Sequence, residues 1–401
     1  GLRKPLSLKD ICKRRSISQK SDAVDKYMKQ KISFEDIPVD IIEEYGRQDV
    51  ISTRALFDAQ MVDFKKHDNK PLLKSAKMMN EFLPVLGEME RNGINIDLPA
   101  LNQVEQEFKE EFGRLAQEIK RIIREKMGDT PINPGSTEQL SWLIYSKKVK
   151  DKKKWVDIFN IGIDKFTKKK KRRPTLSKSR FRDMVVANTE VIKKTSATKC
   201  LECNGTGQIR KYKVDGGRYK NLSKCHECGG QGVIYYELNR TAGFDQMPVG
   251  VSEVAEGGFK TDRDTLRKLS MRAKGDMKEF VDIIIRYNAI DTYLNTFVNG
   301  IRDHVNEDSV LHPKFMQCVT ATARLSSRDP NFQNQPRGNT FPIRKVISSR
   351  FDGGKIMEID FSQLEFRTAV FLAQDKQGMK DIDDGVDVHQ FTADTIGVSR
   401  Q

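Results

Sequence analysis

Apolar residues in the first third of the chain recur at intervals of three and four positions, which places them on one face of an α-helix. This spacing predicts helices over residues 8–15, 38–61, 74–92 and 98–122. Ser7 and Asp97 precede two of these segments as N-caps, and Gly93 follows a third, where a glycine commonly ends a helix. The N-terminal part of the chain is therefore expected to be largely helical.

The pattern changes twice further along the chain. After a short capped helix predicted over 133–145, the helical spacing gives way between 147 and 258 to lysine runs, glycines and four cysteines, which indicates an insertion. Helical spacing returns over 262–304, and strands and turns are expected from residue 315 onward. In that last part, residues 355–360 predict a short apolar strand that ends at Asp360.

The composition is that of a globular protein, with 37% hydrophobic and 32% charged residues in a chain of 401. This length predicts two or three domains. No apolar run approaches the roughly 18 residues of a membrane span, and the first ten residues lack the apolar centre of a signal peptide. Six cysteines are too few for a disulfide-rich secreted protein. Secreted and membrane classes are excluded on these grounds.

The positive charge of the chain is concentrated in one segment. The chain carries a formal net charge of +15, and residues 147–224 alone hold 25 basic and 7 acidic residues, a net of +18. Such a patch usually meets a polyanion, most often nucleic acid phosphate. For the runs at 147–154 and 168–173, a solvated and partly disordered loop is the alternative.

Two C-x-x-C pairs lie within the same segment, and each is followed by a glycine pattern, NGTG and GGQG. Two thiolate pairs of this spacing complete a tetrahedral zinc site, and four protein ligands leave no position for a substrate, so the zinc is interpreted as structural. The glycines are expected to turn backbone N–H groups toward the sulfurs. The expected ligands are Cys200, Cys203, Cys225 and Cys228, with His226 as a bystander.

These cysteine pairs resemble the cysteine-rich region of J-protein co-chaperones over about 35 residues, but the chain has no HPD tripeptide. The resemblance is therefore not evidence of chaperone activity. A zinc-dependent module that binds a protein client is kept as a third class of function.

The predicted strand and turn at 355–367 carry the most informative residues. A carboxylate at the end of a strand, here Asp360, is suited to bind Mg²⁺, although such an aspartate also commonly caps the next helix. As a string, DFSQLEFR at 360–367 resembles motif A of family A DNA polymerases, D-Y-S-Q-I-E-L-R. Three further matches occur in family order: TARLSSRDPNFQNQP at 322–336, the pair IR at 343–344, and DVHQFTA at 387–393.

The resemblance extends toward the N-terminus. Residues 81–96 are similar to the segment between exonuclease and thumb, and residues 132–140 and 259–266 are similar to two thumb elements that normally lie close together in sequence. The basic cysteine-bearing stretch separates those two elements, so it is expected as an insertion in the thumb. Tyr45-Gly-Arg-Gln-Asp49 is similar to the third motif of the DnaQ-like 3′→5′ exonuclease, in which the aspartate binds Mg²⁺ and the tyrosine orients the attacking water.

The resemblance to the polymerases implies roles for individual residues. Asp360 is expected to bind both catalytic Mg²⁺ ions with help from the carbonyl of Phe361, and Glu365 to exclude ribonucleotides. His389 is expected to contact the phosphates of the incoming nucleotide, unless it is a buried structural histidine. The remaining implied contacts are Ser362 and Gln363 with the nucleotide, and Arg324, Gln333, Asn334 and Arg344 with DNA.

The implied fold is multidomain, α/β and α+β. The expected parts are the end of a DnaQ/RNase H-like exonuclease at 1–70, the linker and start of a helical thumb at 71–146, the basic insertion at 147–258 with a zinc ribbon at 195–240, thumb helices at 259–310, and the start of a palm with an antiparallel sheet at 311–401. The R-x3-K-x6-Y-G and H-D-E motifs of the family do not occur, so the chain is expected to be truncated before the fingers and the second half of the palm.

Template-directed DNA synthesis on primer–template DNA with dNTPs is the leading function, in the cytoplasm of a cell or of a phage host. A non-catalytic or split DNA-binding subunit, active only with a complementing polymerase chain, is the main alternative. Tyr45, Asp49 and Glu365 argue against a single-subunit RNA polymerase. The basic insertion is expected either to hold DNA electrostatically or to dock a processivity factor.

Overall fold

The structure of the chain is a computed structural model that describes residues 7–17, 23–164, 167–212, 217, 220–320, 322–336 and 340–398. The chain divides into two compact units, Gly1–Val346 and Ile347–Gln401. In the described part, no helix is long and apolar enough to cross a membrane.

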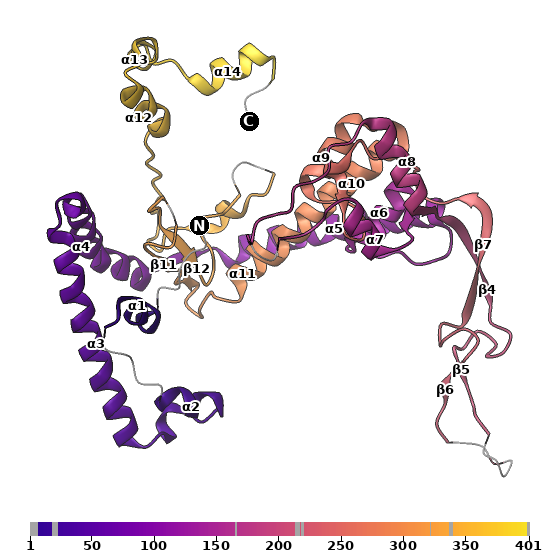
Figure 1. Cartoon of the computed structure of the whole chain (residues 1–401), viewed down its shortest axis with the longest axis horizontal. Coiled ribbons are helices and arrows are strands. Elements are labelled where there is room, and N and C mark those ends of the chain that lie inside the picture. The colour runs from indigo at the N-terminus through magenta and orange to yellow at the C-terminus, as the bar shows by residue number, and fades with distance from the viewer. Residues whose placement is uncertain are drawn as a thin grey trace. The chain divides into compact units, whose positions relative to one another are not determined.

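The first unit begins with helices α1 (Leu8–Arg15), α2 (Ala23–Lys29), α3 (Val39–Lys65) and α4 (Lys70–Asn92), joined in part by the short turns η1 (Phe34–Asp36) and η2 (His67–Asn69) (Figure 1). Ser7 caps α1 by accepting a hydrogen bond from the backbone N–H of Asp10, and Arg15 of α1 pairs with Asp63 of α3 at 2.7 Å. Gly93 ends α4 with a φ of +66°. The predicted helices and these two terminal residues are confirmed.

The long helix α5 (Leu98–Met127) packs against α10 (Gly275–Thr292), which continues through the π-helical turn η4 (Tyr293–Val298) into α11 (Asn299–Arg302). Asp97 caps α5 through the N–H of Ala100 at 2.9 Å. At one end of the pair, Phe108 lies 4.7 Å from Tyr293 between ring centroids and 5.6 Å from Phe341. Here β1 (Ile94–Ile96) pairs antiparallel with β10 (Val310–Leu311), so this first core closes around the N-terminal half of α5.

A second core closes around the other end of the same helix pair. It is built with α6 (Thr137–Tyr145), α7 (Lys152–Ile158), α8 (Lys178–Asn188), α9 (Arg263–Arg272) and the short strands β2 (Lys147–Val149), β3 (Thr189–Val191), β8 (Val254–Ala255) and β9 (Gly258–Phe259), with η3 (Val251–Glu253) preceding β8. At its centre the Trp155 ring meets those of Phe159 and Phe259 at 4.6 and 5.7 Å.

This second core revises the picture of residues 147–258 as an inserted body. Trp155, Phe159 and Phe181 are fully or nearly fully buried together with Phe259 and Leu266 of the flanking thumb-like segment. The two flanks of the stretch therefore belong to one core with the helices on either side, and the burial of these apolar side chains stabilises both together.

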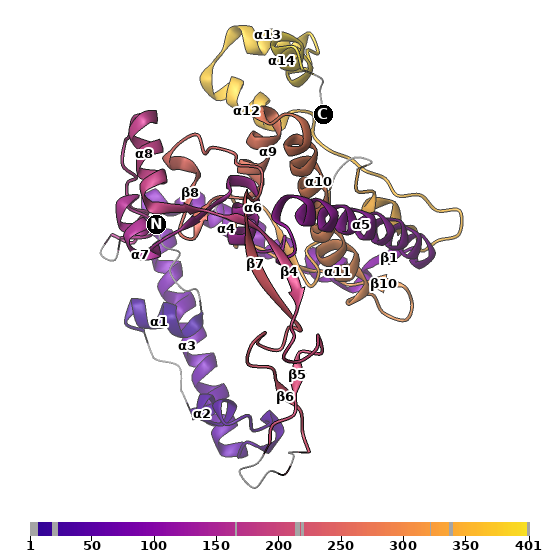
Figure 2. The same cartoon turned by 90° about the vertical axis from the view of Figure 1, so that its right-hand side faces the viewer.

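A narrow ribbon extends beyond that core in the described part of 147–258. It is formed by β4 (Lys193–Lys199) and β7 (Val233–Thr241), with the smaller pair β5 (Gln208–Ile209) and β6 (Ser223–Lys224) beyond them (Figures 1 and 2). At its base the N–H of Asp129 donates to Thr195 O at 3.1 Å, and the carboxylate of Asp129 accepts the N–H of Ala197 at 2.9 Å. The ribbon is thus attached to the residues that follow α5.

The first unit ends with the hairpin β11 (Lys314–Met316) and β12 (Ser326–Arg328), followed by the turn η5 (Ile343–Val346). The second unit contains β13 (Ile347–Ser348) and three short helices, α12 (Leu364–Ala373), α13 (Lys376–Asp383) and α14 (Val388–Ile396).

The strand predicted over 355–360 is wrong. These residues lack regular structure and are exposed, with Met357 at 80% and Ile359 at 85% of their full accessible surface. A strand requires hydrogen bonds from a neighbouring strand, and no described strand of this unit pairs with the segment. Apolar residues alone do not form one.

Replacement of Gly128 by alanine should destabilise the anchored end of α5. At Gly128, whose φ is +90°, a Cβ atom would lie 2.0 Å from Thr195 O. We expect a loss of about 2–3 kcal/mol in the free energy of unfolding, from the close contact and the left-handed backbone together. Urea unfolding followed by the fluorescence of Trp142 and Trp155, the two tryptophans of the chain, measures it.

The matched control is Gly113→Ala, within α5, where a Cβ atom would meet nothing within 4 Å. Alanine should there stabilise the helix by about 0.5–1 kcal/mol. Equal effects at the two positions would contradict the proposed contact.

Candidate functional site

The four cysteines of the two C-x-x-C pairs form a buried cluster in the ribbon, between the β4–β7 pair and the β5–β6 pair. Their Sγ atoms all lie within 4.8 Å of one another, with Cys200–Cys225 at 3.8 Å and Cys203–Cys228 at 3.6 Å. Sulfurs held about 2.3 Å from one tetrahedral ion would be about 3.8 Å apart. The predicted ligands are therefore brought together at distances that could hold a metal ion.

The glycines after each pair serve the cluster as predicted. Gly207 donates its N–H to Cys203 Sγ, and Gly232 donates to Cys228 Sγ, both at 3.2 Å. A Cβ atom at Gly207 would lie 2.3 Å from Gly230 O, so this approach requires glycine.

The pKa values of two of the thiols shift in opposite directions. A backbone hydrogen bond lowers the pKa of Cys200, but burial and the contacts with the other three cysteines outweigh it and raise that pKa to about 11. Burial raises the pKa of Cys203, but the N–H of Gly207 and the contacts with Cys200 and Cys228 outweigh it and lower the pKa to about 7. A lowered pKa favours the thiolate, the form that binds metals. His226 is exposed and lies outside the group, in agreement with its predicted role as a bystander.

The motif A residues lie in the second unit, around the start of α12. Asp360 and Phe361 lie in the exposed segment before the helix, and Glu365 lies in its first turn. Gln363 adopts a left-handed φ of 53° at the helix start, and the carbonyl of Ser362 accepts a hydrogen bond from Arg367 Nε at 2.9 Å. An exposed carboxylate in this position is open to a metal ion but needs further ligands to hold one.

His389 lies in the first turn of α14, whose N-cap is Asp387. The carboxylate of Asp387 accepts the backbone N–H groups of His389 and Gln390 at 3.0 and 3.2 Å. The imidazole is exposed, so the alternative of a buried structural histidine is wrong.

The four residues expected to contact DNA lie in the first unit, and all are exposed. Arg324, Gln333 and Asn334 belong to the segments on either side of β12, while Arg344 lies on η5. The buried hydroxyl of Ser327 accepts the N–H groups of Phe332 and Gln333 at 2.8 and 3.2 Å. One buried serine thus shapes the turn that presents Gln333 and Asn334, a role that the sequence did not reveal.

Tyr45 and Asp49 lie one turn apart on α3, and both are half-buried. Asp49 borders a shallow hollow of about 500 Å³, in which it is the only acid among the five lining residues. Tyr45 and Asp49 thus have the spacing expected of the exonuclease motif. Within the lining of this hollow, however, no second carboxylate lies beside Asp49 to help hold Mg²⁺.

Lys147 and Arg173 are among the residues of the basic segment that are engaged in the fold. Lys147 is buried, and its Nζ pairs with Asp245 at 2.9 Å, while the half-buried Arg173 donates to backbone carbonyls. Nothing in the lysine-rich sequence distinguishes these two residues from their exposed basic neighbours.

Comparisons with known proteins concern the second half of the chain most directly. Residues 240–400 match the family described as DNA polymerase family A. DNA polymerase I of Streptococcus pneumoniae is 30% identical over 159 residues, which are 38% of this chain and 17% of that protein. The DNA polymerase of Bacillus phage SP01 is 29% identical over 195 residues, 45% of this chain and 21% of that one.

A solved structure resembles the chain more widely. It is the POL domain of Pol1 from M. smegmatis, in complex with DNA primer-template and dNTP, with a TM-score of 0.55 and 18% identity. The similarity covers 99% of this chain and 48% of that one. At this identity it supports the fold, and the chain spans about a fifth of the length of the curated relatives that it matches.

The cysteine cluster can be tested with Co²⁺, whose thiolate complexes absorb visible light. We expect one equivalent to bind, and Gly207→Ala to weaken binding at least tenfold, because the added Cβ atom would displace the N–H group from Cys203 Sγ. Gly229→Ala is the control, since Gly229 also has a positive φ but its Cβ atom would meet nothing within 4 Å. Similar losses in both variants would show that backbone strain, and not the contact, controls the site.

Proposed function

We propose that the chain takes part in template-directed DNA synthesis on a primer–template with dNTPs, because residues 240–400 match the family described as DNA polymerase family A. The observation that carries the proposal is the match of this segment, which includes the motif A string at 360–367. The fold similarity to a polymerase domain supports it.

In this proposal, Asp360 binds the Mg²⁺ ions of the synthesis site with help from the carbonyl of Phe361. The bound metals would activate the primer 3′-hydroxyl and stabilise the leaving pyrophosphate. Glu365 would exclude the 2′-hydroxyl of ribonucleotides. The exposure of Asp360, Phe361 and Glu365 leaves them open to nucleotide and metal.

The remaining contacts follow the same proposal. His389, Ser362 and Gln363 would contact the incoming nucleotide. Arg324, Gln333, Asn334 and Arg344 would contact the DNA; the minor groove offers similar acceptors for all base pairs, so contacts there would test pairing without reading sequence. All four are exposed.

The cysteine cluster is proposed to hold one structural Zn²⁺. Four buried thiols with sulfurs 3.6–3.8 Å apart across the two pairs suit a tetrahedral ion. With four protein ligands, the ion would join the β4–β7 and β5–β6 pairs of the ribbon and take no part in synthesis.

The N-terminal helices are proposed as the end of a 3′→5′ exonuclease-like domain, with Tyr45 and Asp49 in its active site and Asp49 as a Mg²⁺ ligand. The one-turn spacing on α3 supports this part. The five-part domain division from 1–70 to 311–401 is proposed with it, amended at 147–258 by the shared core. Work in the cytoplasm and dependence on a complementing chain or processivity factor are further parts of the proposal.

The synthesis site can be tested by replacing Asp360 in the complete gene product. Asp360→Ala should lower primer extension by at least about 10³-fold, because a carboxylate ligand of the catalytic metals is lost, while affinity for primer–template DNA stays within a few-fold. Asp352→Ala removes an exposed aspartate from the same segment and should leave extension unchanged. Full extension by the Asp360 variant would remove this residue from the metal site.

Removal of zinc should unfold the ribbon and leave the rest intact. A chelator is expected to melt only residues near 190–240, since the closed site stabilises its own small hairpin. Limited proteolysis should then cut the ribbon, while the fluorescence of Trp155, buried in the second core, stays unchanged. Loss of the native tryptophan signal at the same chelator concentration would show that the ribbon and the core fold as one.

A further inference from the structure

Five consecutive basic side chains stand exposed in a short loop between α7 and α8. They are Lys168, Lys169, Lys170, Lys171 and Arg172. None of them forms an ion pair with a described carboxylate. We call residues 167–172 the basic loop. Its charge is therefore not compensated by the surrounding described surface.

Backbone hydrogen bonds give the loop a defined shape. Ile163 and Lys170 form an antiparallel bridge, the N–H of Asp164 donates to Lys169 O at 2.8 Å, and the N–H of Lys171 donates to Gly162 O at 3.0 Å. The carboxylate of Asp164, an acid at the start of this turn, accepts the N–H and the hydroxyl of Thr167 at 2.6 and 2.8 Å. The acid is thus engaged in the turn and leaves the lysines to other partners.

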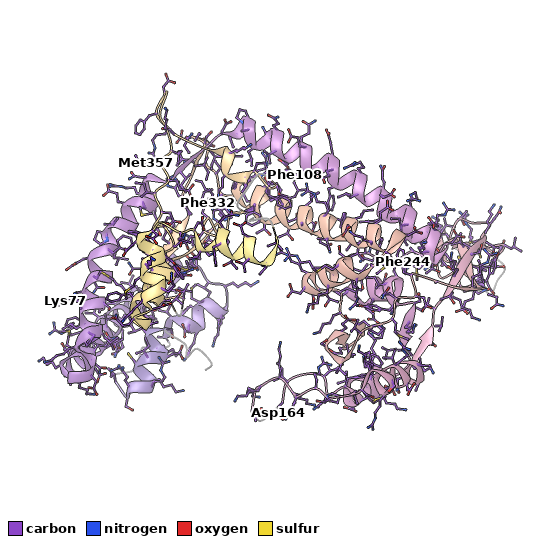
Figure 3. The ribbon with its side chains drawn as sticks, turned by 90° about the horizontal axis from the view of Figure 1, so that it is seen from above. Lys77, Phe108, Asp164, Phe244, Phe332 and Met357 are labelled. Atoms are coloured by element: carbon purple, nitrogen blue, oxygen red, sulfur yellow. The ribbon has the colours of Figure 1, made fainter. Side chains whose placement is uncertain are left out.

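The far end of the loop is fastened to the second core. Arg173 donates through its guanidinium to Phe159 O at 3.4 Å and to Val254 O at 3.3 Å, and Asn160 Nδ2 donates to Arg172 O at 2.8 Å. Figure 3 shows the loop around Asp164 leading away from the packed helices. The five charges are therefore held on a fixed base, which lowers the entropy lost when they bind a partner.

The chemistry of the loop favours phosphate as that partner. Residues 167–172 hold no apolar side chain, whereas protein interfaces are depleted in lysine and enriched in aromatic residues. Single-stranded nucleic acid is usually held by stacking on aromatic rings, and the basic loop has none. From Lys168 to Arg172 the chain reaches at most about 14 Å, a length along which one strand of a DNA duplex presents about four phosphates.

We propose that the basic loop binds the phosphate backbone of duplex DNA, through side chains that belong to none of the polymerase motifs. The inference rests on the proposed function, which supplies the primer–template duplex as the ligand. The loop would add affinity without sequence preference, because phosphates carry no sequence information.

The test compares the salt dependence of DNA binding between the 401-residue chain and a loop variant with Lys168→Gln, Lys169→Gln, Lys170→Gln, Lys171→Gln and Arg172→Gln. Anisotropy of a labelled duplex of about 20 base pairs is measured between 50 and 200 mM KCl. The slope of log K against log salt is negative, and the loss of about four phosphate contacts in the loop variant should make it less steep by about 3–4. Over this range the unmodified chain should therefore lose about 100-fold more affinity than the variant.

A matched control removes an equal number of positive charges, five, at exposed positions outside the loop. At each of these positions the charge already pairs with a carboxylate three or four residues away. Its substitutions are Lys66→Gln, Arg91→Gln, Lys109→Gln, Arg121→Gln and Lys278→Gln. Its slope should stay within about one unit of the unmodified chain. Equal slopes for the loop variant and the control would overturn the proposal, because net charge alone would then explain both.

Two further outcomes separate the possible failures. If the unmodified chain binds the duplex and the loop variant keeps its slope, the loop proposal fails while the proposed function stands. If the unmodified chain does not bind duplex DNA at all, both fail. In a third experiment, binding of the unmodified chain and of the loop variant to vesicles with 30% anionic lipid is measured. If the loop variant loses vesicle binding while its DNA binding is unchanged, the proposal is overturned in favour of a lipid surface.

Discussion

The packing of α5 on α10 is the constraint on which both cores of the first unit depend. Near its start α5 contributes Val104 and Phe108 to the first core, and near its end it contributes Ile119 and Ile123 to the second. α10 runs the other way: its start contributes Phe280 to the second core, and its end and the turn after it contribute Ile290 and Tyr293 to the first. Because one pair of helices carries both cores, a change in their packing reaches the β1–β10 pair at one end and the base of the ribbon at the other. The bidentate ion pair of Arg286 with Glu111, at 2.7–2.8 Å, joins the two helices between the cores.

This arrangement explains how a two-stranded ribbon can extend beyond a core. An isolated hairpin is only marginally stable in water, so the ribbon needs fixed ends. Its base is held directly after α5 by two hydrogen bonds of Asp129, one from its own N–H to Thr195 O and one from the N–H of Ala197 to its carboxylate, and the outer end of the β4–β7 pair is closed by the four thiols. The middle of the ribbon carries exposed side chains such as Tyr236 and contributes little burial. The two ends therefore determine whether the ribbon is formed.

The sequence predicted the features that depend on near neighbours. The caps Ser7 and Asp97 and the terminal glycine Gly93 act within one helical turn, and each C-x-x-C pair with its glycines is a local unit, so these were confirmed. It failed where the partner is distant. The strand at 355–360 was predicted from its own apolar residues, but pairing is decided elsewhere in the chain. Trp155 and Phe159 lie in a lysine-rich segment whose composition hides their burial in the second core. The same holds for the candidate site: the grouping of the four cysteines could be predicted from their spacing, whereas the surroundings of Asp49 and Asp360 could not.

The exposed segment before α12 links the missing strand to the chemistry proposed for it. Ile356, Met357 and Ile359 expose between 61% and 85% of their surface, and burying such a side chain is worth about 1.5–3 kcal/mol. A strand that paired with this segment and covered these side chains would gain that free energy and would also fix the backbone of Asp360. A carboxylate that binds two metal ions must be held within about 0.5 Å, which an unpaired, exposed segment does not provide. Pairing of a strand with residues 355–360 and formation of the proposed metal site at Asp360 are therefore expected to occur together.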